Sequence, residues 1–313
     1  MASRTVSAGI LQYAPAHGQL LASMERLESL LAQAAEAHLD LAVVGETWLS
    51  GYPVWLDHCP NVARWNHAPT KQVFGELYRN SITVEGPEVK QIQAWVKKHG
   101  LVLGLGINER VEKGYGSGSL YNSLLLFDAD GKLVNHHRKL VPTYTERLVH
   151  AHGDAAGLQA VDTAVGKVGG LVCWEHWMPL ARHAMHTSGE EIHLALWPTV
   201  HEMHQVASRQ YAFEGRCYVL AAGQLMQVKE LPPTLEVAPE LAQSPEAYVM
   251  RGGSAVIGPD GFYLTEPVFE ESSLVTATLE LDRLAEERMN LDVTGHYYRP
   301  DVFEVNINRK RPE

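Results

Sequence analysis

The stretch VGKVGGLVCWEHWMPLARHAM, residues 165–185, joins a strand, a tight turn and a helix in direct succession. Its first part, VGKVGGLVC (165–173), is an apolar run of strand length that predicts a buried strand. Pro179 predicts the first turn of a helix, a position that proline tolerates. Cys173 therefore stands at a strand-to-helix turn, next to Gly169-Gly170 on one side and Trp174 on the other.

The same alternation of strands and helices extends over the chain in both directions. Leucine and methionine recur at helical spacing from Leu20 to Leu31, with Leu21, Met24, Leu27 and Leu30 between them, and predict a helix. Further strands are predicted at 6–13, 39–46, 101–109, 191–198, 217–224 and 274–282, and further helices at 86–99, 203–216 and 282–290.

Two Asp-Gly pairs, Asp130-Gly131 and Asp260-Gly261, lie between apolar runs and predict β-hairpins. Hairpins among βα units indicate an α/β fold with mixed sheets. We expect a single domain over 1–313, with the Pro-, Glu- and Ala-rich stretch 229–247 as a surface excursion within it.

The composition argues against several partners. Lys plus Arg total 26 against 37 Asp plus Glu, for a net charge of −11, which disfavours nucleic acid and membrane surfaces. No apolar run approaches the roughly 20 residues that cross a bilayer. Three cysteines with no CxxC spacing predict neither a disulfide framework nor a zinc site, so we expect a cytoplasmic protein.

Three reactive side chains end predicted strands: Glu46, Lys139 and Cys173. Strand ends are where α/β sheets place their sites, so the three can converge. A thiol beside a carboxylate and a cation is an activated nucleophile. Singly, each residue has an ordinary alternative as a surface charge or a buried thiol, which is our interpretation of Cys59 and Cys217.

Four stretches resemble the nitrilase family of carbon–nitrogen hydrolases: VVGETWLSGYPVW (43–55), HHRKLVPTYTERLVHAHGD (136–154), GGLVCWEHWMPLARHAM (169–185) and TGHYYRPDVF (294–303). The resemblance covers about residues 6–304. It implies a four-layer α-β-β-α sandwich with mixed sheets. It also implies that Glu46 is the general base, Lys139 the cationic stabiliser, Cys173 the nucleophile and Glu146 a second glutamate beside the thiol.

The implied reaction is hydrolysis of an organic nitrile to the carboxylic acid and ammonia, with water as co-substrate and no cofactor. Lys139 and the backbone N–H of Trp174 are expected to stabilise charge on the nitrile nitrogen. Two carboxylates beside one thiol cannot both stay ionised comfortably. We expect Glu146 to hold the proton and Glu46 to be ionised.

Nearness to the strand-end motifs predicts a substrate pocket made of Tyr52, Trp55, Trp174, His176, Trp197 and His201. Histidine is abundant, at 16, but no HExxH spacing occurs. His201 and His204 are three residues apart, and we expect imidazoles of this kind to be solvated or buried rather than to bind metal. The expected metal site is therefore none.

Other activities remain open from sequence. A cyanide-degrading enzyme or an amidase of the same superfamily would keep Glu46, Lys139 and Cys173. From other classes, an inactive oligomeric scaffold and a His-rich metal-binding protein are alternatives. The resemblance implies a homodimer or higher homo-oligomer, with the C-terminal tail from about 296 in oligomer contacts. Extended filaments are not expected, because the chain ends soon after DVFEV.

Overall fold

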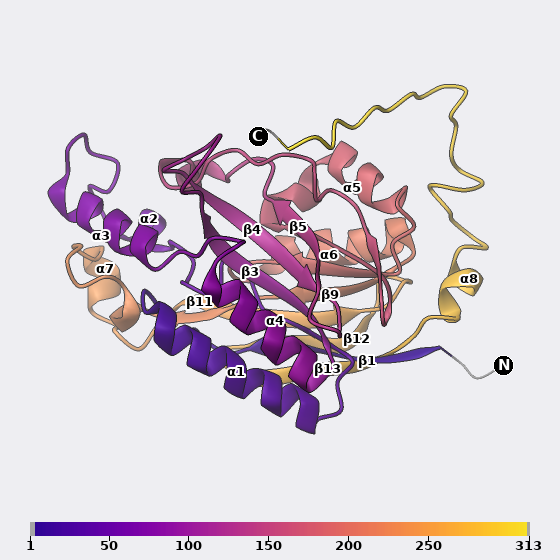
Figure 1. The fold of residues 1–313 in the computed structure, drawn as a ribbon, viewed down its shortest axis with the longest axis horizontal. Coiled ribbons are helices and arrows are strands. Elements are labelled where there is room, and N and C mark those ends of the chain that lie inside the picture. The colour runs from indigo at the N-terminus through magenta and orange to yellow at the C-terminus, as the bar shows by residue number, and fades with distance from the viewer. Residues whose placement is uncertain (1–3, 312–313) are drawn as a thin grey trace.

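The computed structural model describes residues 4–311 and contains two mixed β-sheets (Figure 1). In the first sheet β1, β2 and β3 are parallel, and antiparallel strands flank them on both sides. Its strand order is β13 (Ser273–Glu280), β1 (Thr5–Gln12), β2 (Leu41–Val43), β3 (Val102–Arg110), β4 (Leu120–Phe127) and β5 (Leu133–Arg138).

The second sheet has a parallel centre of β7, β8 and β9. Its order is β10 (Leu225–Gln227), β11 (Tyr248–Ile257), β9 (Tyr218–Ala222), β8 (Ile192–Leu196), β7 (Gly166–Val172) and β6 (Val161–Thr163), with β12 (Tyr263–Phe269) paired to β11. Both predicted hairpins are confirmed, β4–β5 around Gly131 and β11–β12 around Gly261, and both glycines have positive φ, which their turns require.

Helices cover the outer face of each sheet, so the predicted four-layer α-β-β-α sandwich is confirmed (Figure 1). α1 (Leu20–Glu36) and α4 (Pro87–His99) lie side by side on the first sheet, and their apolar faces form one core with it. α5 (Pro179–His186) and α6 (Glu202–Gly215) pack on the second sheet. Side chains such as Ile10 and Leu194 join the two sheets in a further core.

Smaller helices complete the fold. α2 (Trp55–His58), α3 (Ala68–Arg79) and α7 (Pro239–Ala242) gather at one end, and α8 (Arg283–Glu287) follows β13 (Figure 1). The sequence did not predict α2 or α3. The stretch 229–247 contains α7 and buries Leu231 and Leu235 in a third apolar cluster, so it is anchored to the body of the domain.

Two local differences from the sequence prediction have physical causes. Leu21 on α1 is 78% exposed, because it lies outside the stripe formed by Met24, Leu27 and Leu31. β2 ends at Val43 rather than at Glu46. Beyond Val44 the chain leaves the first sheet and reaches the second, where the Glu46 backbone N–H donates to the Trp197 carbonyl at 3.2 Å.

After α8 the chain forms turns at 293–297 and 300–302 and then returns, without regular secondary structure, to the body of the domain (Figure 1). Arg309 donates to the Leu158 carbonyl, and Arg311 pairs with Asp154 at 2.9 Å. Between α8 and these anchors, Tyr297, Val302 and Phe303 are exposed. Within residues 4–311, no helix is both long and apolar enough to cross a membrane.

Gly106 on β3 allows the close approach of the 45–47 turn. A β-carbon added there would meet the Gly45 carbonyl oxygen and lie 2.6 Å from the Thr47 nitrogen, both backbone atoms. We therefore expect Gly106→Ala to lower the free energy of unfolding by about 1–3 kcal/mol, measured by urea denaturation. Gly75→Ala on α3 is the control, since only the flexible Arg79 side chain is near and alanine favours a helix. Equal stability of Gly106→Ala and the wild type would contradict this account.

Candidate active site

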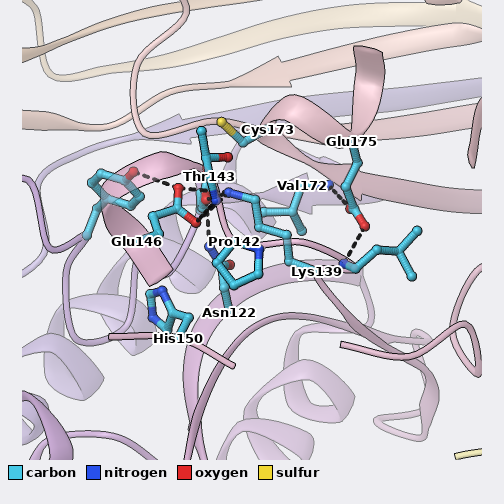
Figure 2. Close-up of polar contacts among 12 residues, drawn as sticks. Asn122, Lys139, Pro142, Thr143, Glu146, His150, Val172, Cys173 and Glu175 are labelled. Carbon is cyan, nitrogen blue, oxygen red and sulfur yellow. Dashed lines mark hydrogen bonds and ion pairs between the residues drawn. The ribbon is translucent and has the colours of Figure 1, made fainter. Parts of the chain in front are cut away.

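The three predicted strand-end residues meet at one place, where the two sheets face each other. Glu46 follows β2 and Lys139 follows β5, both in the first sheet, whereas Cys173 follows β7 in the second. Figure 2 shows Lys139 reaching toward Glu146, with Cys173 on the neighbouring turn. The site therefore depends on how the two sheets pack together.

Lys139 is the buried cation of the site, with 1% of its surface exposed. Its ammonium nitrogen lies 2.8 Å from Glu46 Oε1, and 2.8 and 2.7 Å from the two oxygens of Glu146. These contacts use its three N–H donors. Burial opposes its charge, but Glu46, Cys173 and Glu146 outweigh burial and raise the pKa of Lys139.

Glu146 is held as an ionised carboxylate. Besides Lys139, it accepts hydrogen bonds from the Tyr52 hydroxyl at 2.7 Å and the Thr143 backbone N–H at 3.1 Å. Burial alone would raise the pKa of Glu146, but Lys139, His150 and the hydrogen bond from Tyr52 lower it. The expectation that Glu146 carries the shared proton is therefore wrong, because its oxygens face donors.

Glu46 is the carboxylate that binds a proton more tightly. Its Oε1 accepts from Lys139 and, at 2.6 Å, from Asn122. Its Oε2 is buried and has no hydrogen-bond partner among the described residues. Burial raises the pKa of Glu46 to about 7, with Lys139 opposing and Glu146 reinforcing the shift. A free acceptor atom and a pKa near neutrality are what a general base needs.

Cys173 lies at a strained turn beside these groups. Its φ of 52° falls in the left-handed region, as in the nucleophile elbow of other α/β enzymes. One atom each of Glu46, Glu146 and Cys173 lie within 4.8 Å of one another. Burial and Glu46 raise the pKa of Cys173 well above its ordinary value, whereas the Trp174 backbone N–H lowers it. The thiol therefore keeps its proton until a base removes it.

The same three ligand atoms have the spacing of a metal site. The Lys139 ammonium, however, already lies 2.7–2.8 Å from both carboxylates. A divalent cation there would meet an ammonium group among its own ligands, so the arrangement suits proton transfer better than metal binding.

Glu175 joins the two strand ends, a role that sequence reasoning missed. Its carboxylate accepts from the backbone N–H of Val172 at 2.7 Å and of Leu140 at 2.8 Å, so it ties the residue before Cys173 to the residue after Lys139 (Figure 2). His137 lies 2.9 Å from the same carboxylate, and the side chains of both are buried. The sequence contained a sign of this role, because a glutamate at the third position of a helical turn commonly accepts a hydrogen bond from the backbone N–H of the residue before the turn.

A cavity of about 440 Å³ opens beside Cys173. Of the predicted pocket residues, Tyr52, Trp174 and His201 line it. Trp55, His176 and Trp197 do not line it, although all three are buried. Trp55 lines two other cavities, and Trp197 stacks between His176 and His204. The remaining lining residues, which the sequence did not indicate as a group, are Val54, Asp57, His58, Thr143, Tyr144, Thr145, Pro198, Thr199, His204, Val249 and Met250.

Asn122 was also missed, although the sequence held a signal for it. In the strand LYNSLLLF, Asn122 and Ser123 are polar where every other residue but Tyr121 is purely apolar, and both are buried. A buried polar side chain in such a strand needs a partner, which for Asn122 is Glu46.

A four-layer sandwich that brings a buried thiol, an ammonium group and two carboxylates together beside one cavity defines a class of protein: enzymes that catalyse by nucleophilic attack. The family model for carbon–nitrogen hydrolases matches residues 7–289. The chain belongs to this family, and it is a hydrolase that acts on carbon–nitrogen bonds.

Individual relatives agree with this assignment. A bifunctional nitrilase/nitrile hydratase of Nicotiana tabacum is 34% identical, covering 97% of this chain and 86% of the relative. An aliphatic nitrilase of Sinorhizobium fredii is also 34% identical, covering 97% and 96%. The crystal structure of a carbon–nitrogen hydrolase from Helicobacter pylori is similar in fold, with a TM-score of 0.72 at 23% identity, covering 95% of this chain and 96% of that chain.

The free Oε2 of Glu46 predicts an acid limb in the pH profile. Below a pH of about 7 Glu46 holds its proton and cannot accept one from the thiol, so kcat/KM should fall as the pH drops. Asn122 lowers the pKa of Glu46, so Asn122→Leu should move the limb to higher pH. Ser123→Ala is the matched control, since Ser123 bonds Glu109 instead. An acid limb that stays in place in Asn122→Leu would argue against Glu46 as its source.

Proposed function

We propose that the chain is a nitrilase, which hydrolyses an organic nitrile to the carboxylic acid and ammonia with Cys173 as nucleophile. The observation that carries the proposal is the buried Cys173 thiol close to the carboxylate of Glu46, whose Oε2 has no partner among the described residues, at the wall of a cavity. The nitrilase names of relatives that cover nearly the whole chain support the same substrate class.

In the first step the Cys173 proton moves to Glu46 Oε2 while sulfur bonds to the nitrile carbon. An electron pair of the carbon–nitrogen triple bond shifts to nitrogen, where the Trp174 N–H stabilises it. Lys139 contributes its charge, because its N–H donors are already engaged by the carboxylates. The proton then passes from Glu46 to nitrogen, which gives a thioimidate.

Two waters complete the reaction. Glu46 removes a proton from the first water, whose oxygen bonds to the thioimidate carbon, and passes this proton to the nitrogen. The new hydroxyl group then gives up its own proton, which Glu46 also passes to the nitrogen, so that the carbon–nitrogen bond breaks, ammonia leaves and a thioester remains on Cys173. The second water releases the carboxylic acid and restores the thiol. Glu146 stays ionised in this scheme, where it holds Lys139 and Tyr52 in place.

One alternative outcome has a specific basis. If sulfur leaves instead of nitrogen after the first water adds, the product is an amide, as the name of the bifunctional nitrilase/nitrile hydratase relative implies for that protein. A panel of aliphatic, aryl and arylaceto nitriles, with cyanide and the matching amides, separates the nitrilase from the amide-forming, cyanide-degrading and amidase alternatives.

The covalent step makes a direct prediction. Cys173→Ala should lose nitrile turnover by several orders of magnitude. Acid-quenched wild-type enzyme should carry the acyl group of a slow nitrile on the peptide that contains Cys173, seen by mass spectrometry. Cys59→Ala is the control and should keep most activity, since Cys59 belongs to a different apolar cluster. Acid production by Cys173→Ala near the wild-type rate would refute the mechanism, and an unmodified Cys173 with no turnover of any compound would favour the scaffold alternative.

We also propose a cytoplasmic protein that forms at least a homodimer. All three cysteines are free and buried, which suits a reducing compartment. α5 and α6 expose Leu180, Met203 and Val206, and the C-terminal segment from about 296 exposes further apolar residues. Such residues on adjacent elements are typical of an interface between subunits.

Light scattering tests the oligomer. The wild type should have at least twice the monomer mass of 34.7 kDa. Leu180→Glu and Val206→Glu together place charges on the exposed face of α5 and α6, and this double substitution should reduce the mass to that of the monomer. Leu21→Glu is the control, because Leu21 is even more exposed than Leu180 and Val206 but lies on α1. If the wild type is a monomer, or if the doubly substituted protein keeps the mass of the wild-type oligomer, the face of α5 and α6 is not the subunit interface.

A further inference from the structure

A buried chain of hydrogen bonds leads away from the nucleophile turn. His176 Nδ1 lies 2.7 Å from the Cys173 carbonyl oxygen, and its Nε2 lies 2.9 Å from Nε2 of His193. His193 Nδ1 in turn lies 2.8 Å from Glu190 Oε1. The Tyr211 hydroxyl donates to Glu190 Oε2 at 2.7 Å and ends the chain.

None of these four side chains takes part in the proposed reaction, yet all are inside the protein. The largest exposed fraction among them is 2%, for Glu190. Tyr211 on α6 stacks on His193, and Gly169 on β7 leaves the space that Glu190 Oε1 occupies. Burial of such polar groups costs free energy unless each has a hydrogen-bond partner. The partner of each nitrogen or oxygen atom therefore shows whether that atom carries a proton.

The pairing permits a single arrangement of protons while both imidazoles are neutral. A carbonyl oxygen only accepts, so His176 carries its proton on Nδ1 and its Nε2 accepts. His193 must therefore donate from Nε2, which leaves its Nδ1 as an acceptor. The remaining donor for that atom is Glu190, which must be a protonated carboxylic acid. Burial lowers the pKa of both histidines well below the ordinary value, in agreement with neutral rings.

This chain of hydrogen bonds reaches the reacting atoms through one peptide group, the one between Cys173 and Trp174. The bond between Cys173 and Trp174 is planar, so its carbonyl and its N–H point in opposite directions. Holding the Cys173 carbonyl on His176 therefore fixes the direction of the Trp174 N–H. That N–H lowers the pKa of the Cys173 thiol, and in the proposed reaction it stabilises the nitrile nitrogen.

We propose that Glu190, in its protonated form, is a positioning residue that orients the Cys173–Trp174 peptide through His193 and His176. This inference rests on the proposed function for its catalytic consequence. Loss of the Glu190 proton leaves His193 Nδ1 without a donor. If His193 then moves its proton to Nδ1, two acceptor nitrogens face each other across the link to His176. His176 restores this hydrogen bond by moving its own proton from Nδ1 to Nε2, and the Cys173 carbonyl then loses its donor.

The surroundings of Glu190 favour the proton at neutral pH. His193 on β8, Tyr211 and Glu214 on α6, His186 on α5 and Cys217 before β9 are the titratable groups around it, and Arg288 donates to its backbone oxygen. Burial raises the pKa of Glu190 to about 8, and the Tyr211 hydrogen bond and His186 only partly oppose this. The proposal therefore predicts that kcat falls as the pH rises through about 8.

Glu190→Gln separates this role from an ordinary structural one. The amide N–H₂ can donate to His193 and the amide oxygen can accept from Tyr211, so glutamine imitates the protonated acid but cannot titrate. We expect the variant to remain active at pH 7 and to lose the alkaline limb of kcat. Glu190→Ala should lower kcat by about a hundredfold with little change in KM, as expected when a group beside the reacting atoms is misplaced.

Glu191→Gln is the matched control. Glu191 is the next residue, but it pairs with Arg4 and the Lys167 backbone N–H, outside the chain. It should keep the wild-type pH profile. An alkaline limb that persists unchanged in Glu190→Gln would overturn the proposal.

Infrared difference spectra between pH 7 and pH 10 supply a readout that needs no substrate. Glu46, which titrates near pH 7, contributes a band common to all three proteins. In addition, the wild type should show the carbonyl stretch of a second buried carboxylic acid that is absent from Glu190→Gln and present in Glu191→Gln. Nitrogen NMR of ¹⁵N-histidine-labelled protein should place the protons on Nδ1 of His176 and Nε2 of His193. If nitriles are not substrates but these signals appear, only the proposed function fails. If Glu190 gives no such band, the positioning role fails whatever the substrate.

Discussion

The burial of the Lys139 ammonium between two carboxylates is the constraint on which the rest of the site depends. Removing a charge from water costs several kcal/mol, so each member must have partners inside the protein. Lys139 uses its three N–H donors on Glu46 and Glu146, which fixes the positions of both. One positive and two negative charges leave an excess negative charge beside Cys173. The thiol therefore keeps its proton, and Glu46, with fewer donors than Glu146, binds a proton more readily.

The fold satisfies this constraint by bringing two sheets together at their strand ends. Glu46 and Lys139 come from one sheet and Cys173 from the other, so neither sheet contains the site alone. Bonds cross between them at this point: the Glu46 backbone N–H donates to Trp197, and the Gln224 side chain donates to the Glu46 carbonyl. Glu175 does the same for the strand ends of Lys139 and Cys173. A shift of one sheet relative to the other would separate the base from the thiol.

Local sequence patterns predicted much of this fold. The elements and boundaries that were missed are those that local patterns do not mark. The hairpins at Gly131 and Gly261 follow from turn chemistry, and the helix at 20–36 from its apolar stripe. α3 was missed because only Val73 and Leu77 of its residues are buried, too few for a clear period. The strand at 39–46 was predicted too long, because nothing local marks where the chain crosses to the other sheet.

The resemblance supplied the residues that gather around Lys139 but not their protonation. Which of Glu46 and Glu146 holds the proton depends on donors such as Tyr52 and Thr143, whose positions follow from packing. The buried partners of the nucleophile turn, His193 and Glu190, lie on another strand and the loop before it. Their tautomers follow only from distances in three dimensions.

Glu46 and Glu190 show how burial alone does not decide the role of a carboxylate. Burial raises the pKa of both, to about 7 and about 8. Glu46 lies close to the Cys173 thiol, and one of its oxygens has no partner among the described residues, so that oxygen is free to exchange a proton. Both oxygens of Glu190 are engaged, one by Tyr211 and one by His193, so its proton is part of a fixed hydrogen bond. The proposed reaction therefore needs one buried acid to lose its proton and the other to keep it. These opposite needs are compatible because the two carboxyl groups have different partners: Glu46 keeps one oxygen free to exchange a proton, whereas the proton of Glu190 is shared with His193.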